Sequence, residues 1–181
     1  MAFRIRQATE SDRPVLERII ELSVEKLQAP DYTPEQRAGA LGLIFAIDSQ
    51  LVRDGTYLVA EDETGTILGC GAWSQRGNLF GGDKVPGKAD NLLDPAVDPA
   101  RIRSFFVHPD HARKGVGTAI LHACEAAARA AGYRRAELVA TLTGVPLYAF
   151  HGYAEIRRYE IPLPNGAMLP VVPMAKDLCL Q

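Results

Sequence analysis

Two adjacent cations and two glycines stand together in the segment Arg113-Lys114-Gly115-Val116-Gly117-Thr118. The segment follows an apolar run that ends at Val107, and it leads into a long amphipathic run that ends near Ala131. We therefore expect a strand, a tight turn and a helix in that order. The first turn of a helix presents unpaired N–H groups and a partial positive charge, and glycines let an anion approach the backbone. The sequence predicts a phosphate or diphosphate site here.

Two common nucleotide-binding motifs do not fit this turn. The Walker motif requires Gly-Lys followed by Ser or Thr after four intervening residues, and that ending is absent. The dinucleotide-binding motif requires a small residue three positions after its second glycine, where this chain has Ile120. Both motifs are therefore excluded on specific residues.

Apolar periodicity predicts the elements that position this turn. Pro170 and Pro173 suggest that the last strand is an edge strand or carries a bulge, and Gly69 and Gly71 suggest a bulge or close backbone approach. The pattern predicts an α/β fold: a mixed, mostly antiparallel sheet of about seven strands flanked by about four helices. The expected strands cover residues 3–9, 56–61, 66–74, 101–107, 136–140, 153–161 and 168–176, and the expected helices cover 12–27, 33–52, 114–131 and 146–151.

Length and composition exclude several classes of protein. The chain has 181 residues, which suggests a single domain over residues 1–181 with an irregular loop insertion at about 75–100. The net charge of -2 argues against a nucleic-acid binder or a polybasic membrane module. No apolar run approaches the ~20 residues of a membrane-spanning helix. Three scattered cysteines form neither a disulfide framework nor a zinc motif, so a soluble, cytoplasmic protein is expected.

Two segments resemble one known family. The stretch from Val107-His108-Pro109 through the glycine turn to the alanine-rich helix looks like the acetyl-coenzyme A site of the GCN5-related N-acetyltransferases, the GNAT superfamily. Residues Val145 to Tyr153 resemble that family's closing signature, in which a helical tyrosine precedes Gly-Phe or Gly-Tyr. The order of the expected elements is also similar. The resemblance implies the acyl-CoA N-acyltransferase fold, with acetyl-CoA as acyl donor and no metal ion.

The resemblance also implies a role for each matching residue. It gives Tyr148 the role of general acid toward the departing thiolate, and it makes a backbone N–H of Phe106-Val107 the oxyanion donor. The chain departs from the family pattern at Ala112, where Arg or Gln is frequent, and Arg113 stands next to it. The implied cofactor-binding residues are Phe105, Phe106 and Val107 for the pantetheine arm and thioester, and Arg113, Lys114, Gly115, Val116, Gly117 and Thr118 for the pyrophosphate.

The implied reaction is direct transfer of an acetyl group from acetyl-CoA to a primary amine. The small size and the lack of a basic tail favour a small-molecule amine, while protein lysines or N-termini stay open as acceptors. The acceptor site is expected from residues 32–50 and 75–100. The general base stays open, because the position that matches the family's glutamate is at about Arg101. Glu21, Asp48 and Glu61 are acidic candidates, and a water chain to one of them or a substrate that arrives already neutral would also suffice.

Two alternatives remain beside this enzyme. The first is a non-catalytic acyl-CoA-binding regulatory module on the same fold, and the second is a nucleotide-binding interaction protein. Thermal stabilisation by coenzyme A without turnover would indicate the first, and stabilisation by ATP or NAD alone would indicate the second. The resemblance is compatible with a homodimer through the terminal strands.

Overall fold

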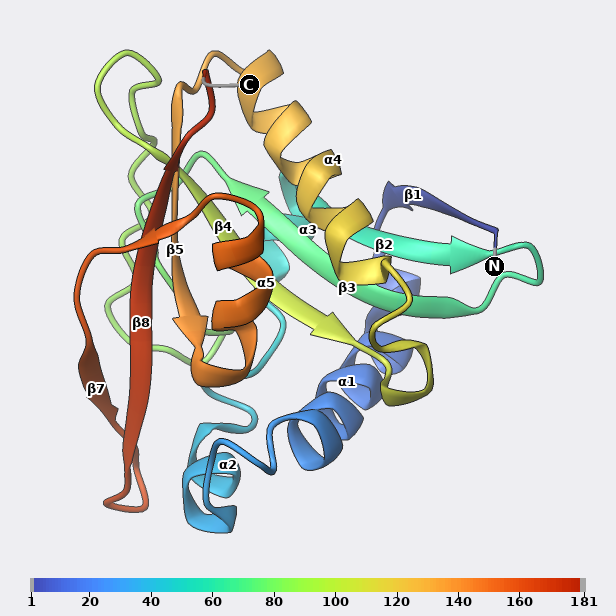
Figure 1. Ribbon diagram of the computed structural model, residues 1–181, viewed down its shortest axis with the longest axis vertical. Coiled ribbons are helices and arrows are strands. Elements are labelled where there is room, and N and C mark those ends of the chain that lie inside the picture. Colours follow the sequence, from blue (N-terminus) through green and yellow to red (C-terminus); the bar gives the residue numbers. More distant parts are fainter. Residues whose placement is uncertain (1, 180–181) are drawn as a thin grey trace.

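A computed structural model describes residues 2–179. Eight strands form one mixed sheet in the order β1-β2-β3-β4-β5-β8-β6, and β7 also pairs with β8 (Figure 1). The strands are β1 (Phe3–Gln7), β2 (Tyr57–Asp62), β3 (Ile67–Ser74), β4 (Ala100–Val107), β5 (Arg135–Thr141), β6 (Ala154–Glu155), β7 (Tyr159–Pro162) and β8 (Met168–Asp177). The α-helices are α1 (Arg13–Leu22), α2 (Pro34–Ala40), α3 (Ser49–Arg53), α4 (Val116–Ala130) and α5 (Val145–Phe150).

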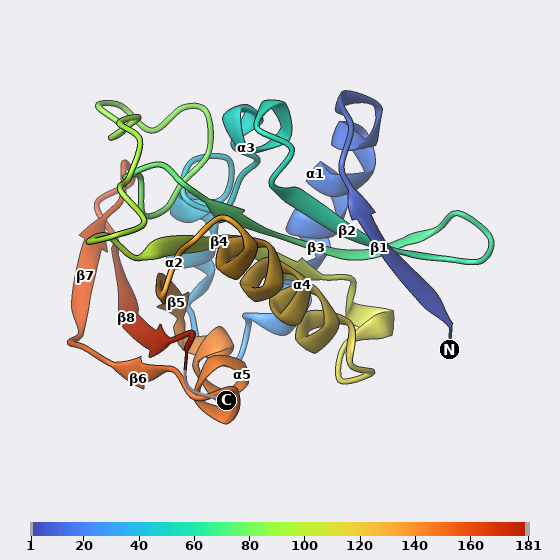
Figure 2. The ribbon, with the colours of Figure 1, turned by 90° about the horizontal axis from the view of Figure 1, so that it is seen from above.

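Helices cover both faces of the sheet. Figure 2 shows α1 and α3 on one face and α4 and α5 on the other. Alternate residues of β2 divide between the two cores: Val59 packs with Leu16 of α1, whereas Leu58 and Ala60 pack with Ile120 of α4. This alternation follows from the two-residue period of a strand that is buried on both faces. The sheet therefore separates the layer of α1 from the layer of α4.

The sheet opens in its middle, between β4 and β5. These two strands are its one parallel pair within residues 2–179, and they are joined by the crossover helix α4. Their pairing covers three residue pairs, from Ala100 opposite Ala136 to Ile102 opposite Leu138. Beyond Ile102 the strands diverge, so one side of the rest of β4 has no strand partner.

A bulge shapes the unpaired part of β4. The pairing of β3 with β4 changes register between Cys70 and Ala72, and Ser104 has a left-handed backbone with φ of 59°. A Cβ atom at Gly71 would lie 2.7 Å from the Phe105 ring and 2.7 Å from the Ile120 side chain. Gly71 is therefore required for close packing here, which confirms the interpretation of the glycines in this strand.

The helix predicted over residues 33–52 is wrong in its length. The predicted capping box at its start is present, with the Thr33 hydroxyl accepting from the Gln36 N–H. However, α2 ends at Ala40, since Leu41 is extended and Gly42 has a φ of 80°. The Asp48 carboxylate then caps a separate helix, α3, by accepting from the Gln50 N–H. The predicted helix over residues 12–27 forms as α1 followed by a π-helical turn over Ser23–Leu27.

The single strand predicted over residues 153–161 forms two strands, β6 and β7. This difference explains why the sheet has eight strands and not the expected seven or so. Both pair with β8, which pairs with β5 on its other side, so β8 is an inner strand and not an edge strand. Pro173 is opposite Val139 on β5 and lies level with the break between β6 and β7. A proline is tolerated there because the ladder on that side is interrupted.

Candidate functional site

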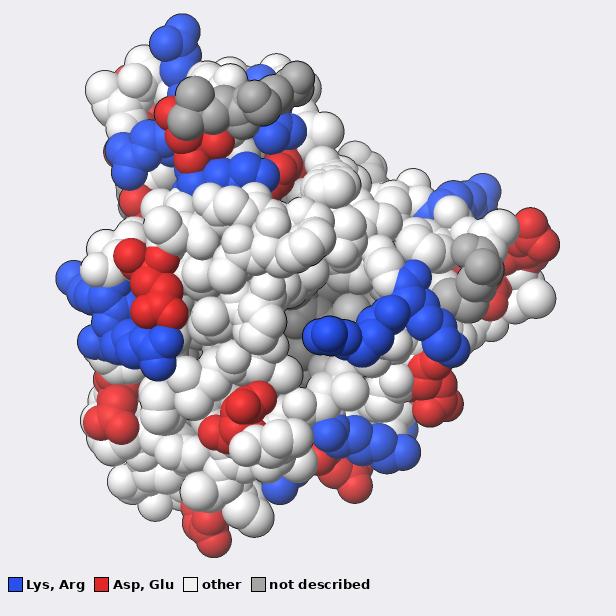
Figure 3. Space-filling view, in the orientation of Figure 1, with Lys and Arg blue, Asp and Glu red and all other residues white. Residues whose placement is uncertain are grey.

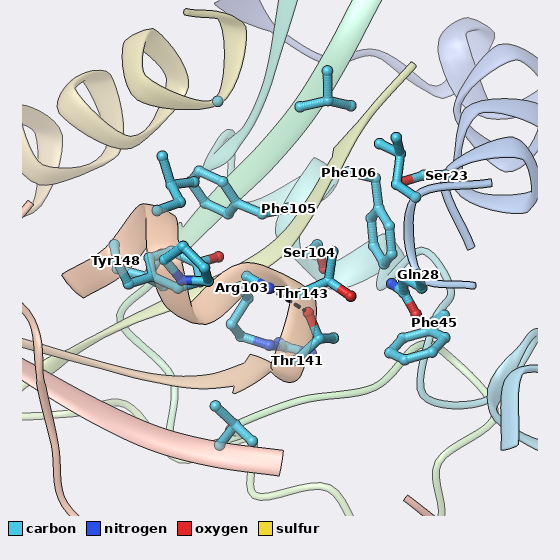
Figure 4. A pocket seen from close by; sticks show the side chains of 18 of the residues that line it. Ser23, Gln28, Phe45, Arg103, Ser104, Phe105, Phe106, Thr141, Thr143 and Tyr148 are labelled. Carbon is cyan, nitrogen blue, oxygen red and sulfur yellow. Dashed lines mark hydrogen bonds between the residues drawn. The ribbon is translucent and has the colours of Figure 1, made fainter. Parts of the chain in front are cut away.

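A cavity of about 780 Å³ occupies the opening between β4 and β5. It extends from the turn before α4, past α5, to the π-helical turn after α1. Figure 4 shows Phe105 and Tyr148 on one side of this cavity and Ser23, Gln28 and Phe45 on the other. The divergence of the two strands thus creates a passage that connects the two layers of the protein.

Eight of the ten residues predicted as site residues line this one cavity. The lining set includes Phe105, Phe106, Val107, Arg113, Gly115, Gly117, Thr118 and Tyr148. Val116 does not line the cavity, because its side chain is buried in the core of the α4 layer. Lys114 lies outside the lining as well: its Nζ donates to the backbone carbonyl of Asp110 at 2.7 Å.

The turn before α4 has the geometry of an anion site. Arg113 and Gly115 both have left-handed backbones, with φ of 62° and 85°, and Gly115 is the N-cap of α4. The first N–H groups of α4 are left without helical partners at this end. Arg113 and Lys114 are exposed, and Figure 3 shows a hollow in this face with Lys or Arg side chains along one rim. The unpaired N–H groups of α4, the positive end of the helix dipole and the charges of Arg113 and Lys114 therefore lie together at this turn.

Gly117 keeps the cavity open beside this turn. A Cβ atom at Gly117 would lie 3.4 Å from the Leu147 side chain of α5 and 3.8 Å from that of Val107 on β4. A methyl group would therefore make ordinary contacts at this position. A larger or acidic side chain would compete with a bound anion for the same space.

Tyr148 is the proton donor candidate. It lies on α5, is buried, and meets the ring of Phe105 edge-on with centroids 6.0 Å apart. Burial raises the pKa of its hydroxyl above the ordinary value of 10.0. The hydroxyl therefore stays protonated at neutral pH, as a general acid must before it donates.

The three acidic residues considered for a general base lie outside the cavity lining, as does Arg101 at the position of the family's glutamate. Glu21 is exposed on α1 and pairs with Arg18, and Glu61 on β2 pairs with two arginines near the N-terminus. Asp48 is buried in an ion pair, and Arg101 pairs with Glu137 on β5 at 2.6 Å. The part of the chain that the structure describes thus places none of them against a ligand in the cavity.

A buried charged cluster closes the cavity behind β4. Arg103 donates from Nη1 to Asp48 Oδ2 at 2.9 Å and from Nη2 to the Gly81 carbonyl at 2.6 Å. Lys88 Nζ lies 3.1 Å from Asp48 Oδ1, so two cations share one carboxylate. The cluster fixes the 75–100 loop to β4, and this position brings Phe80 into the cavity lining.

The sequence pattern missed several polar residues of the lining, among them Ser23, Gln28 and Ser104. A five-residue π-helical turn places Ser23 and Gln28, in which the Gln28 N–H donates to the Ser23 carbonyl at 3.3 Å. Such turns inside helices occur frequently at functional sites. The irregular turn leaves no sequence signal of its own, and the bulge at Ser104 depends on pairing with β3.

A chain of three polar side chains leads from the cavity to the surface. Thr118 Oγ1 lies 3.1 Å from His151 Nε2, and His151 Nδ1 lies 3.3 Å from Nε2 of the exposed His122. Burial, followed by the nearby His122, lowers the pKa of His151 below its ordinary value. His151 is therefore neutral at neutral pH. Through Thr118 it connects to the turn before α4 that contains Arg113 and Gly115, which we call the anion turn.

The profile of the acetyltransferase (GNAT) family matches residues 16–153, a range that includes the anion turn, the opened sheet and Tyr148. The chain belongs to the GNAT acetyltransferase family. The matched range ends at Tyr153, the last residue of the second segment that carries the resemblance. A sequence comparison with curated proteins finds no significant match.

Solved GNAT structures have the same fold. A GCN5-related N-acetyltransferase from Rhodopseudomonas palustris is 23% identical, with a TM-score of 0.71 over 98% of this chain and 96% of its own. The PaiA N-acetyltransferase of Thermoplasma acidophilum, solved with coenzyme A, is 14% identical, with a TM-score of 0.67 over 98% and 99%. A phosphinothricin acetyltransferase from Sinorhizobium meliloti, solved with acetyl-CoA, is 23% identical, with a TM-score of 0.64 over 98% and 89%.

Residues 2–179 contain neither a metal-binding group of side chains nor a helix that could span a membrane. No group of three or more His, Cys, Asp or Glu side chains is arranged to hold a metal ion. None of the helices in this range has the length and apolar character needed to cross a bilayer.

Proposed function

We propose that the protein is an N-acetyltransferase that moves an acetyl group directly from acetyl-CoA to the primary amine of a small molecule. The observation that carries this proposal is the single cavity that joins the anion turn, the unpaired edge of β4 and Tyr148. Acetyl-CoA carries a diphosphate, a flexible amide-containing arm and a thioester, and these three parts match the three features in order. The coenzyme A and acetyl-CoA bound to two GNAT structures of the same fold support the same ligand.

Each part of the cavity would contribute a separate interaction. The backbone N–H groups around Gly115 and Gly117 would bind the diphosphate, with Arg113 adding charge. The backbone of β4 beyond Ile102 would pair with the amides of the pantetheine arm, because no neighbouring strand uses that edge. A backbone N–H near Phe106 and Val107 would stabilise the oxyanion that forms during attack, a contribution of roughly 3–4 kcal/mol for one donor.

The reaction balances with the groups at hand. The lone pair of a neutral amine attacks the thioester carbonyl, a C–N bond forms, and the C–S bond breaks with the electron pair going to sulfur. The amine loses one proton and the coenzyme A thiolate gains one. Tyr148, whose hydroxyl stays protonated, would supply the proton to sulfur.

Binding and turnover test this proposal separately. Coenzyme A and acetyl-CoA should raise the melting temperature, whereas ATP and NAD at equal concentration should not. A thiol-release assay over a panel of amines should then show free coenzyme A that depends on the amine. Stabilisation without turnover on any amine would instead indicate a non-catalytic acyl-CoA-binding module. Stabilisation by ATP or NAD alone would contradict both.

A further inference from the structure

The part of the cavity that lies across from Tyr148 has its own chemical character (Figure 4). We call it the distal section and define it by Ser23, Gln28, Ile44, Phe45, Phe80 and Phe106. Three aromatic rings dominate its walls, and the rings of Phe45 and Phe106 meet edge-on with centroids 6.1 Å apart. Aromatic walls of this kind favour a flat, apolar ligand over a flexible charged chain.

Gln28 is the polar group of this section that the fold leaves unused. Its side chain is 4% exposed, and its Oε1 atom is buried without a hydrogen-bond partner among the described residues. The backbone is fixed on both sides, because the Gln28 N–H donates to Ser23 and its carbonyl accepts from Tyr32. Figure 4 shows the Gln28 amide beside the Phe45 ring in the cavity. A buried amide oxygen without a partner is costly, so a hydrogen-bond donor of a ligand is its expected partner.

The charges around the cavity oppose a cationic ligand. Within residues 2–179, the ionisable side chains of the lining are Arg103, Arg113 and Tyr148. Behind Arg103, Asp48 faces both Arg103 and Lys88, so this cluster retains one excess positive charge. An ammonium group that leaves water for this cavity would lose its hydration and meet no carboxylate in the lining. The neutral form of an amine avoids both costs.

We propose that the acceptor is a weakly basic amine with a flat apolar body, of the aromatic amine or hydrazine class, which binds uncharged with its amino group on the Gln28 amide. This inference rests on the proposed acetyl transfer and specifies its substrate. The apolar body would lie among Phe45, Phe80 and Phe106. Because the amine enters neutral, its attack on the thioester needs no side chain as general base. The proton that the amine loses replaces, through solvent, the one that Tyr148 gives to the thiolate.

The pH dependence of kcat/KM for two acceptors of the same shape tests the inference. Phenethylamine and β,β-difluorophenethylamine share one skeleton, but fluorine makes the second amine much less basic. For each, kcat/KM should rise with pH and level off at that amine's own pKa, so the two midpoints should differ by the difference in amine pKa. A common midpoint, or a fall in kcat/KM as the amine loses its proton, would overturn the inference. No coenzyme A release with any amine would overturn the proposed function as well.

Variants at Gln28 test the amide contact. Gln28→Met keeps the length of the side chain and removes the amide, so kcat/KM for phenylhydrazine should fall about tenfold, the value of one hydrogen bond. Gln28→Glu should shift the preference from phenylhydrazine toward the cationic phenethylamine. Gln75→Glu is the matched control, since Gln75 is half-buried outside the cavity lining, and its preference should equal that of the wild type. Thermal stabilisation by coenzyme A shows whether each variant is folded. An unchanged preference in folded Gln28→Glu would contradict the contact.

Discussion

Ile102 and Leu138 form the last residue pair of the short parallel ladder between β4 and β5. Beyond this pair the two strands diverge, and the cavity occupies the space between them. The pair therefore marks where the continuous sheet ends and the cavity begins. On one side of it Arg101 and Glu137 form a structural ion pair, and on the other side the backbone of β4 is free for a ligand.

Loss of the Tyr148 hydroxyl should reduce turnover far more than binding. In Tyr148→Phe we expect kcat to fall about 10²- to 10⁴-fold, the range for a general acid, because the thiolate would leave without a proton. The affinity for coenzyme A should stay close to that of the wild type. The measurement is steady-state thiol release beside calorimetric titration of coenzyme A. Tyr153→Phe is the control, since Tyr153 is equally buried, packs 5.8 Å from Tyr148 and lies outside the cavity lining. Equal kcat in both variants would contradict the acid role.

An acidic side chain at Gly117 should abolish binding of the donor. In Gly117→Glu, a carboxylate would stand where the diphosphate is expected, so the affinity for acetyl-CoA should fall by more than tenfold. Gly117→Ala separates charge from size, because its methyl group would make only ordinary contacts with Leu147 and Val107. We expect Gly117→Ala to retain most of the affinity. Unchanged affinity in Gly117→Glu would show that the anion site is elsewhere.

The buried ion pair of Arg103 and Asp48 should contribute strongly to stability. Asp48→Ala would leave the buried Arg103 and the partly buried Lys88 without their carboxylate, and we expect a loss of about 3–5 kcal/mol in the free energy of unfolding. Urea denaturation measures this loss. Glu155→Ala removes the partner of Arg158 from a pair on the surface, and it should lower the free energy of unfolding far less than Asp48→Ala does. Similar costs for the two variants would contradict the role of the cluster.

His151 should make the fold sensitive to mild acid. Its pKa is lower in the folded protein than in the unfolded chain, so the unfolded state binds protons more readily. The stability that His151 contributes is fully present above its unfolded pKa of about 6.5, and it is lost as the pH falls through the lower pKa of the folded state. The melting temperature of His151→Gln should therefore fall less than that of the wild type between about pH 7.5 and pH 5.5. Parallel curves for the two proteins would contradict this assignment.

The local parts of the site could be predicted from the sequence. The strand, the glycine turn and α4 are contiguous, so periodicity and turn chemistry were enough to locate Arg113, Gly115 and Gly117. The requirement for glycine at position 71 was also visible, although its cause, the Phe105 ring, was not. Tyr148 depended on the family resemblance, because a helical tyrosine alone indicates only packing.

The individual residues of the distal section could not be predicted, because residues far apart in the sequence build it. Ile44, Phe45 and Phe80 lie within the ranges 32–50 and 75–100 that the sequence predicts for an acceptor site. Asp48 and Arg103 are 55 positions apart, and only the folded chain shows that their pairing removes Asp48 from the candidates for a base. The helix expected over residues 33–52 is broken by a turn at Leu41 and Gly42. The helical spacing of apolar residues continues through this turn, so the pattern alone does not reveal the break. Gln28 enters the cavity through a π-helical turn that simple helical periodicity does not distinguish from an α-helix.

The most direct test of the account is a product assay on the full chain. The protein is incubated with acetyl-CoA and a weakly basic amine, and free coenzyme A thiol and N-acetylated amine are quantified together. We expect both products to appear in equal amounts with the wild type and to be strongly reduced with Tyr148→Phe. Free coenzyme A without acetylated amine, or equal yields from the two proteins, would contradict it.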